Sequence, residues 1–122
     1  MAAYLYLNAA LYLLFAVWCT IAPSSTAKNL GYVSLTSAGR SEYLVIYGGL
    51  QIGLAVLFFL LARNPATLRL GLIISIGLYG PIVLYRITTV ARFWPVAAMT
   101  VATGILELTL LIAAVAILYA KS

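Results

Sequence analysis

Long apolar runs, separated by short groups of turn-forming residues, divide the chain into four segments. The runs cover residues 4–22, 41–62, 65–90 and 95–119. Each has roughly the 20 mostly apolar residues that a helix needs to cross a bilayer. The pattern predicts an all-α integral membrane protein in which residues 1–122 form a single domain, an antiparallel bundle of four transmembrane helices.

Turn-forming residues mark the ends of the predicted helices. Pro23 ends the first helix, and Ser41 is a suitable N-cap for the second. Asn64 and the proline after it begin the third helix, and Pro95 begins the fourth after a short turn. Residues 23–40 are left as one longer loop between the first two helices. Because the other connections are short, both termini are expected on the same side of the membrane.

Polar side chains recur every three or four residues within each run. Residues with this spacing share one face of a helix. The four stripes are Tyr4, Asn8 and Tyr12; Tyr43, Tyr47 and Gln51; Ser75, Tyr79 and Arg86; and Thr100, Thr103 and Glu107. A single polar stripe on each helix is expected to face the inside of the bundle.

The composition supports a membrane protein and excludes several classes of partner. Hydrophobic residues make up 66% of the chain and charged residues 7%. The net charge of +5 is spread along the chain rather than gathered in a basic run, so membrane lipids and not nucleic acid are the expected partners. Cys19 is the only cysteine and histidine is absent, so we expect no disulfide within the chain, no metal site and no cofactor.

The basic residues do not distinguish the two sides of the membrane. Each predicted face has three, namely Arg63, Arg69 and Lys121 on the face with the termini and Lys28, Arg40 and Arg92 on the other. We expect cytoplasmic termini, because the long, weakly charged loop suits the outside better.

Two charged residues, Arg86 and Glu107, lie deep within predicted spans, whereas Glu42 and Arg69 lie near span ends. A charged side chain costs about 2.5 to 3.5 kcal/mol at the centre of a bilayer, so Glu107 and Arg86 should have partners or a function. A rise of about 1.5 Å per residue places Arg86 roughly 9 Å and Glu107 roughly 15 to 20 Å below the face that carries the long loop. The long arginine side chain spans this offset, which predicts an ion pair within the membrane.

The stripes have a structural and a functional interpretation. In the structural one, the ion pair and the tyrosine hydroxyls only orient the helices. In the functional one, polar residues line a cavity that handles an amphipathic molecule or a proton. The candidate cavity residues are Glu107, Arg86, Tyr47, Gln51, Tyr79, Glu42 and Tyr12. Glu42 also has a local interpretation, as an acid in the first helical turn that pairs with Arg40.

Small residues predict where helices approach closely. The small-xxx-small pairs are Gly49 and Gly53 in the second run and Gly71 and Ser75 in the third. We expect contacts within the bundle, and homodimerisation through the same motif is the alternative. Gly80 and Pro81 should bend the third helix, because Pro81 leaves a carbonyl one turn earlier without its partner. A bend there is the favoured place for a pocket.

Part of the second run resembles a known family. Residues 42–51 contain a glutamate followed five residues later by Tyr-Gly-Gly, and Arg86 and Glu107 follow in the later runs. This arrangement, over nearly the whole chain, resembles the bacterial membrane proteins called domain of unknown function 4345, which look related to the DoxX-like four-helix group. The resemblance implies four helices in a bacterial inner membrane and supplies no established activity.

Three classes of function fit these residues. The favoured one is binding of a lipid or another amphipathic molecule in the polar-lined cavity, as a carrier or as an accessory subunit of a larger complex. The second is an intramembrane enzyme, an isomerase or a quinone-linked partner, with Glu107 as acid or base and Arg86 assisting. The third is a small proton-coupled exporter.

Overall fold

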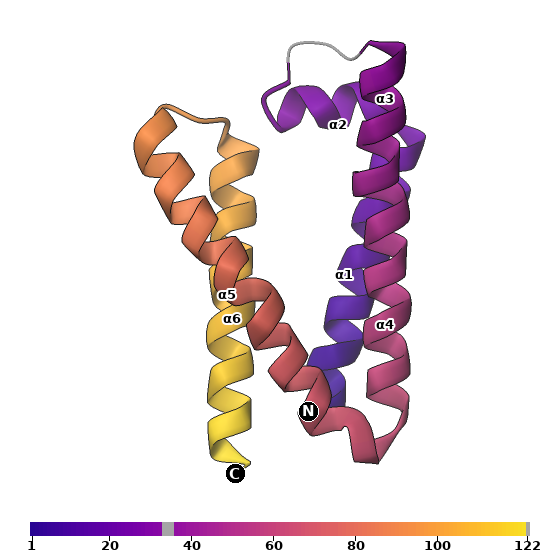
Figure 1. Ribbon diagram of the computed structural model, residues 1–122, viewed down its shortest axis with the longest axis vertical. Coiled ribbons are helices and arrows are strands. Elements are labelled where there is room, and N and C mark those ends of the chain that lie inside the picture. The colour runs from indigo at the N-terminus through magenta and orange to yellow at the C-terminus, as the bar shows by residue number, and fades with distance from the viewer. Residues whose placement is uncertain (33–35, 122) are drawn as a thin grey trace.

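The computed structural model describes residues 1–32 and 36–121 (Figure 1). Within these residues the regular structure is entirely helical, and four helices are long and apolar enough to cross a membrane. They are Ala2–Ile21, Ser37–Arg63, Pro65–Phe93 and Ala98–Ala120. The prediction of an all-α, four-helix membrane bundle is therefore confirmed.

Shorter elements divide two of these spans. The elements in order are α1 (Ala2–Ile21), α2 (Pro23–Asn29), α3 (Ser37–Leu44), the π-helical segment η1 (Val45–Leu50), α4 (Gln51–Arg63), the 3-10 turn η2 (Pro65–Thr67), α5 (Leu68–Phe93) and α6 (Ala98–Ala120). The second span is thus one continuous helix with a π-helical stretch in it. The third begins with the 3-10 turn, where the Asn64 side chain accepts a hydrogen bond from the Ala66 N–H at 3.0 Å.

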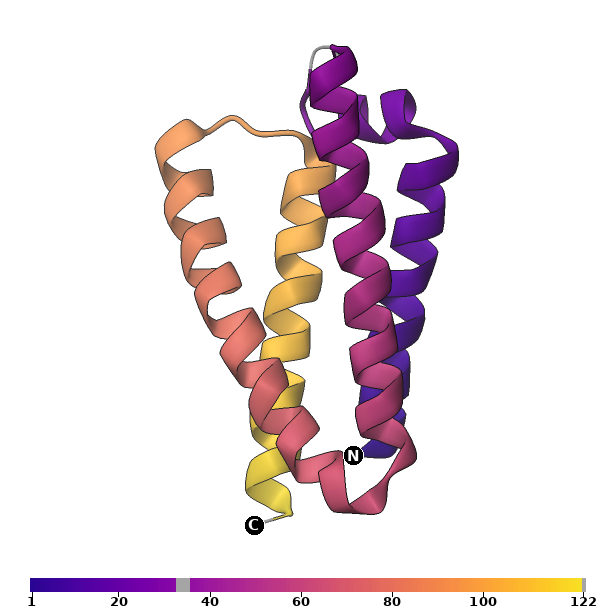
Figure 2. The same cartoon turned by 45° about the vertical axis from the view of Figure 1, so that its right-hand side comes forward.

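The helices associate as two pairs. α1 packs along α4 and α5 packs along α6, whereas contacts between the two pairs are much fewer. Figure 1 shows the pairs close together at the end that holds both termini and apart at the end that holds α2. Figure 2 shows the two termini at the same end again, as the short connections predict.

Buried side chains close the bundle at the end that holds the termini. They are Tyr4, Leu5, Ala9, Phe58, Leu61, Ala62, Leu72, Tyr79, Leu110 and Ala114. At Gly71 of α5, an added Cβ would lie 2.6 Å from Cδ1 of Leu5, so α1 packs directly on the α5 backbone. Ser75, one turn later, is also buried and donates to the Gly71 carbonyl at 2.8 Å. The second small-residue pair therefore lies where α5 meets α1.

The contact within the bundle predicted for Gly49 and Gly53 is wrong. Both are exposed, and a Cβ on either would meet no atom within 4 Å. Gly48 makes the close approach instead, since its Cβ would lie 2.9 Å from Oγ1 of Thr20. The motif fixes a spacing along the helix but not the face that meets a partner, and here the buried face carries Gly48 and Ala55.

Two predicted helix starts are wrong. The Thr36 side chain accepts a hydrogen bond from the Gly39 N–H at 3.0 Å and caps the second span, so Ser41 lies inside the helix. Pro95 precedes the fourth helix, whose N-cap is Ala97. In both cases the apolar run marks the stretch that crosses lipid, while local hydrogen bonds decide where the helix begins.

The segment predicted as one long loop contains a helix. Residues 23–29 form α2, which lies across the open end of the bundle beside α3 (Figure 1). The Tyr43 hydroxyl donates to Oγ1 of Thr26 at 2.8 Å, and Cys19, Ala27 and Tyr43 form a second buried cluster. This cluster holds α2 against both α1 and α3.

Candidate functional site

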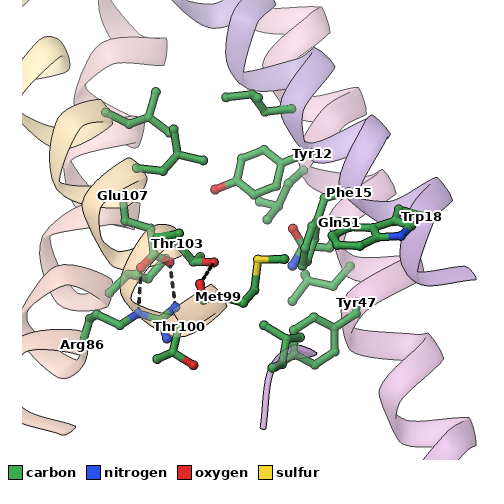
Figure 3. Close-up of a pocket in the computed structure, with 18 of the residues that line it drawn as sticks. Tyr12, Phe15, Trp18, Tyr47, Gln51, Arg86, Met99, Thr100, Thr103 and Glu107 are labelled. Carbon is green, nitrogen blue, oxygen red and sulfur yellow. Dashed lines mark hydrogen bonds and ion pairs between the residues drawn. The ribbon is translucent and has the colours of Figure 1, made fainter. Parts of the chain in front are cut away.

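A cavity of about 970 Å³ lies between the α1–α4 pair and the α5–α6 pair (Figure 3). All four spans contribute to its lining, together with the segment after α2. The lining residues are Leu11, Tyr12, Leu14, Phe15, Trp18, Leu30, Gly31, Tyr32, Tyr47, Leu50, Gln51, Leu54, Leu78, Tyr79, Ile82, Arg86, Met99, Thr100, Ala102, Thr103, Leu106, Glu107 and Leu110. Six of the seven candidate cavity residues from the sequence are among them.

Arg86 of α5 and Glu107 of α6 form an ion pair in the cavity wall. Nε of Arg86 donates to Oε1 of Glu107 at 2.9 Å, and Nη2 donates to Oε2 at 3.2 Å. The side chains are 31% and 15% exposed. This two-point geometry is the strongest form of an arginine–carboxylate contact, and it confirms the ion pair predicted from the depths of the two residues.

Gly104 makes room for the arginine, a role that the sequence analysis missed. A Cβ on Gly104 would lie 3.0 Å from Cγ of Arg86 and 3.4 Å from its Cδ. The arginine stem therefore crosses α6 at this glycine to reach Glu107, which lies three residues further along the same helix face. That spacing in the sequence is the signal that would have identified Gly104.

Polar groups with free hydrogen-bonding capacity line the cavity on both sides. Thr103 donates to the Met99 carbonyl at 2.7 Å and can still accept. The side chains of Thr100 and Gln51 make no hydrogen bond to any residue in the described part of the chain. Figure 3 shows Thr100 on the same side as the ion pair and Gln51 on the opposite side.

Aromatic side chains form the opposite wall. Phe15 of α1 lies edge-on to both Trp18 and Tyr47, with ring centroids 6.2 Å apart in each case. Tyr12 stacks on Phe58 of α4, with centroids 5.7 Å apart and planes inclined by 4°. Such pairs stabilise each other beyond simple burial. The wall that they form is largely apolar (Figure 3).

The π-helical segment carries Tyr47 into this wall. π-helical turns are rare, and many occur at functional sites. The segment Val45–Leu50 includes Tyr47 and the adjacent Gly48 and Gly49, and Gln51 follows it at the start of α4. The irregular turn thus contains Tyr47 and directly precedes Gln51, and nothing in the apolar pattern of the sequence indicates it.

Tyr79 lies at the inner end of the cavity and belongs to a buried hydrogen-bonded chain. Its hydroxyl donates to Oδ1 of Asn8, whose Nδ2 donates to the Tyr4 carbonyl at 2.9 Å. The Tyr4 hydroxyl donates to the Leu110 carbonyl at 2.7 Å. Tyr79 is 2% exposed. Its hydroxyl links α5 to α1, and the residue also contributes to the cavity lining.

Glu42 does not belong to the cavity, which corrects both interpretations of it. Its side chain is exposed on α3 and is absent from the lining. It does not lie in the first turn of α3 either. Arg40 donates to Oγ of Ser24 at 3.3 Å rather than pairing with Glu42. The earlier start of α3, directly after Thr36, is what moves Glu42 away from the helix end.

Gly80 and Pro81, where the sequence predicts a bend and a pocket, do not line the cavity. The helix continues through Pro81, which is exposed, and a Cβ on Gly80 would meet nothing within 4 Å. Neither residue is therefore a packing contact. Leu78, Tyr79 and Ile82 on either side of them line the cavity instead.

Comparisons with known protein families, with curated proteins and with solved structures find no match to this chain. The chemistry of the site must therefore be inferred from its own residues. Among the described residues, no three histidine, cysteine, aspartate or glutamate side chains gather in a way that could hold a metal ion. The arrangement is a partly open, mostly apolar cavity with a neutralised ion pair and several neutral hydrogen-bonding groups.

Proposed function

We propose that this membrane protein binds one lipid or other amphipathic small molecule in the cavity between its two helix pairs. The observation that carries the proposal is the lining, in which a few convergent polar groups interrupt leucine, isoleucine and aromatic side chains. Binding sites for small molecules typically combine these features and measure about 300 to 1,000 Å³. A volume of about 970 Å³ fits that range.

The location of the cavity favours a ligand that dissolves in the bilayer. All four spans supply lining residues, and this favours a molecule held at membrane depth over one bound at a water-filled surface. An ion pair that only orients helices needs no cavity beside it. The position of Arg86 and Glu107 in the cavity lining therefore supports binding over a purely orienting role for the pair.

The role of the protein in the membrane is part of the same proposal. The protein would act as a carrier or as an accessory subunit of a larger membrane complex. Residues 42–51 resemble the domain of unknown function 4345 family. From this resemblance we likewise propose that the protein belongs to that family and lies in a bacterial inner membrane.

Mass spectrometry of molecules that co-purify with the protein tests binding. Thr103→Trp fills the cavity from α6 without removing either member of the ion pair. Ile105→Trp is the matched control, because Ile105 is 62% exposed on the same helix and lies outside the lining. We expect a defined compound with the wild type and with Ile105→Trp, and its loss with Thr103→Trp. The same bulk lipids with all three proteins would reject the proposal.

A further inference from the structure

The charge of the cavity restricts the head group of its ligand. Arg86 and Glu107 carry the only formal charges among the described lining residues, and each is bound to the other at two points. The lining is therefore neutral overall. A charged head group would leave water without gaining an opposite charge, and such burial is strongly unfavourable.

Neutral hydrogen-bonding groups face the same space. The Gln51 amide and the Thr100 hydroxyl line the cavity and lack a side-chain hydrogen bond within the described residues. An amide and a hydroxyl can each donate and accept. They lie on opposite walls, on α4 and α6 (Figure 3), so a polar head group in the cavity has a hydrogen-bonding partner on either helix pair.

The rest of the lining suits a hydrocarbon body. Leu11, Leu14, Leu50 and Leu54 line the α1–α4 side. Ile82 and Leu106 line the other side. Burial of hydrocarbon against these residues supplies affinity, while the few polar groups fix the orientation of the head.

We infer that the ligand is a lipid with an uncharged head group that both donates and accepts hydrogen bonds, such as a long-chain alcohol or an acylglycerol. This inference rests on the proposed binding function and specifies its ligand class. The ion pair excludes charged lipids by keeping the cavity neutral, and Gln51 and Thr100 bind the head group.

A matched series of lipids with one tail tests the inference. Hexadecanol, hexadecyl sulfate and hexadecyltrimethylammonium share one saturated C16 tail and carry a neutral, an anionic and a cationic head group. A diazirine-bearing hexadecanol is photocrosslinked to the lining residues of the protein in lipid nanodiscs. Each of the three compounds is added as a competitor at equal mole fraction, and the decrease in crosslinking is measured. For the wild type we expect hexadecanol to compete at least about tenfold better than either charged compound. A wild-type preference for a charged compound would overturn the inference, and this comparison needs no variant.

Charge variants test the role of the ion pair. Glu107→Gln leaves Arg86 without its carboxylate, so competition by hexadecyl sulfate should improve by about tenfold or more. Glu42→Gln removes the same charge outside the cavity and should change nothing. An equal response of the two variants contradicts the inference. The binding function itself is tested separately by co-purification with Thr103→Trp, a test that does not depend on head-group charge. Loss of a defined charged compound there would overturn the inference and support the binding function, whereas loss of no compound would reject the binding function.

Discussion

At the scale of single residues, the ion pair depends on a glycine as well as on its two charged members. Arg86 reaches Glu107 only by crossing α6 at Gly104, where its Cγ lies 3.0 Å from the position of a Cβ. Side chains in a membrane bundle gain little from hydrophobic exclusion, so such close approaches and polar contacts provide much of the specificity. Gly104 is thus a positioning residue for the pair.

We predict that Gly104→Val destabilises the protein by about 1 to 3 kcal/mol, because the added methyl groups displace the arginine stem. The measurement is reversible unfolding in mixed micelles, repeated in an Arg86→Ala background that removes the crowded side-chain atoms. Most of the cost should disappear there, with a coupling energy of about 0.5 to 3 kcal/mol. An equal cost in both backgrounds would show that Gly104 does not act through Arg86.

The buried hydrogen-bonded chain gives a second prediction. Tyr79→Phe removes the donor to Asn8 and leaves the amide oxygen without it, so we expect a loss of about 1 kcal/mol in unfolding free energy. Tyr85→Phe is the control, because Tyr85 is 72% exposed on the same helix. Equal stability of the two variants would mean that these buried hydrogen bonds do not stabilise the contact between α5 and α1.

The sequence predicts the polar residues well because their spacing along a helix records both face and depth. It predicts the contact between Arg86 and Glu107, and it identifies Tyr12, Tyr47 and Gln51, all of which line the cavity. It fails for Glu42, whose position depends on a helix start set by the Thr36 cap rather than by the apolar run. Local hydrogen bonds of this kind leave only a weak pattern in a single sequence.

At the scale of helices, the small residues show what a motif can and cannot predict. The spacing of Gly71 and Ser75 coincides with the face of α5 that meets α1, while the equal spacing of Gly49 and Gly53 lies on an exposed face. Which face meets a partner depends on the assembled bundle. The sequence of one helix does not contain that information.

These two glycine sites should respond in opposite ways to alanine. Gly71→Ala places a methyl group 2.6 Å from Leu5, so we expect destabilisation by about 1 to 3 kcal/mol. Gly53→Ala meets open space and improves helix propensity, so its effect should be neutral or stabilising by up to about 1 kcal/mol in the monomer. Unfolding by SDS measures both, and a larger loss for Gly53→Ala would contradict the packing described here.

At the scale of the whole molecule, the division into two helix pairs creates the cavity. The pairs meet through the buried side chains near the termini and separate toward α2 (Figure 1). Hydropathy predicts four spans because lipid imposes their length, but it does not say which helices pair. The volume of the cavity and its aromatic wall follow from that pairing and could not be predicted from the sequence.

The most direct test of this account is photocrosslinking from inside the cavity in intact membranes. Benzoylphenylalanine at Leu54, a lining residue of α4, is compared with the same group at Val56, which is 52% exposed on that helix and lies outside the lining. Mass spectrometry of the adducts should find one defined neutral lipid class from position 54 and the mixed bulk phospholipids from position 56. The same mixture from both positions would contradict the claim that the cavity is a binding site.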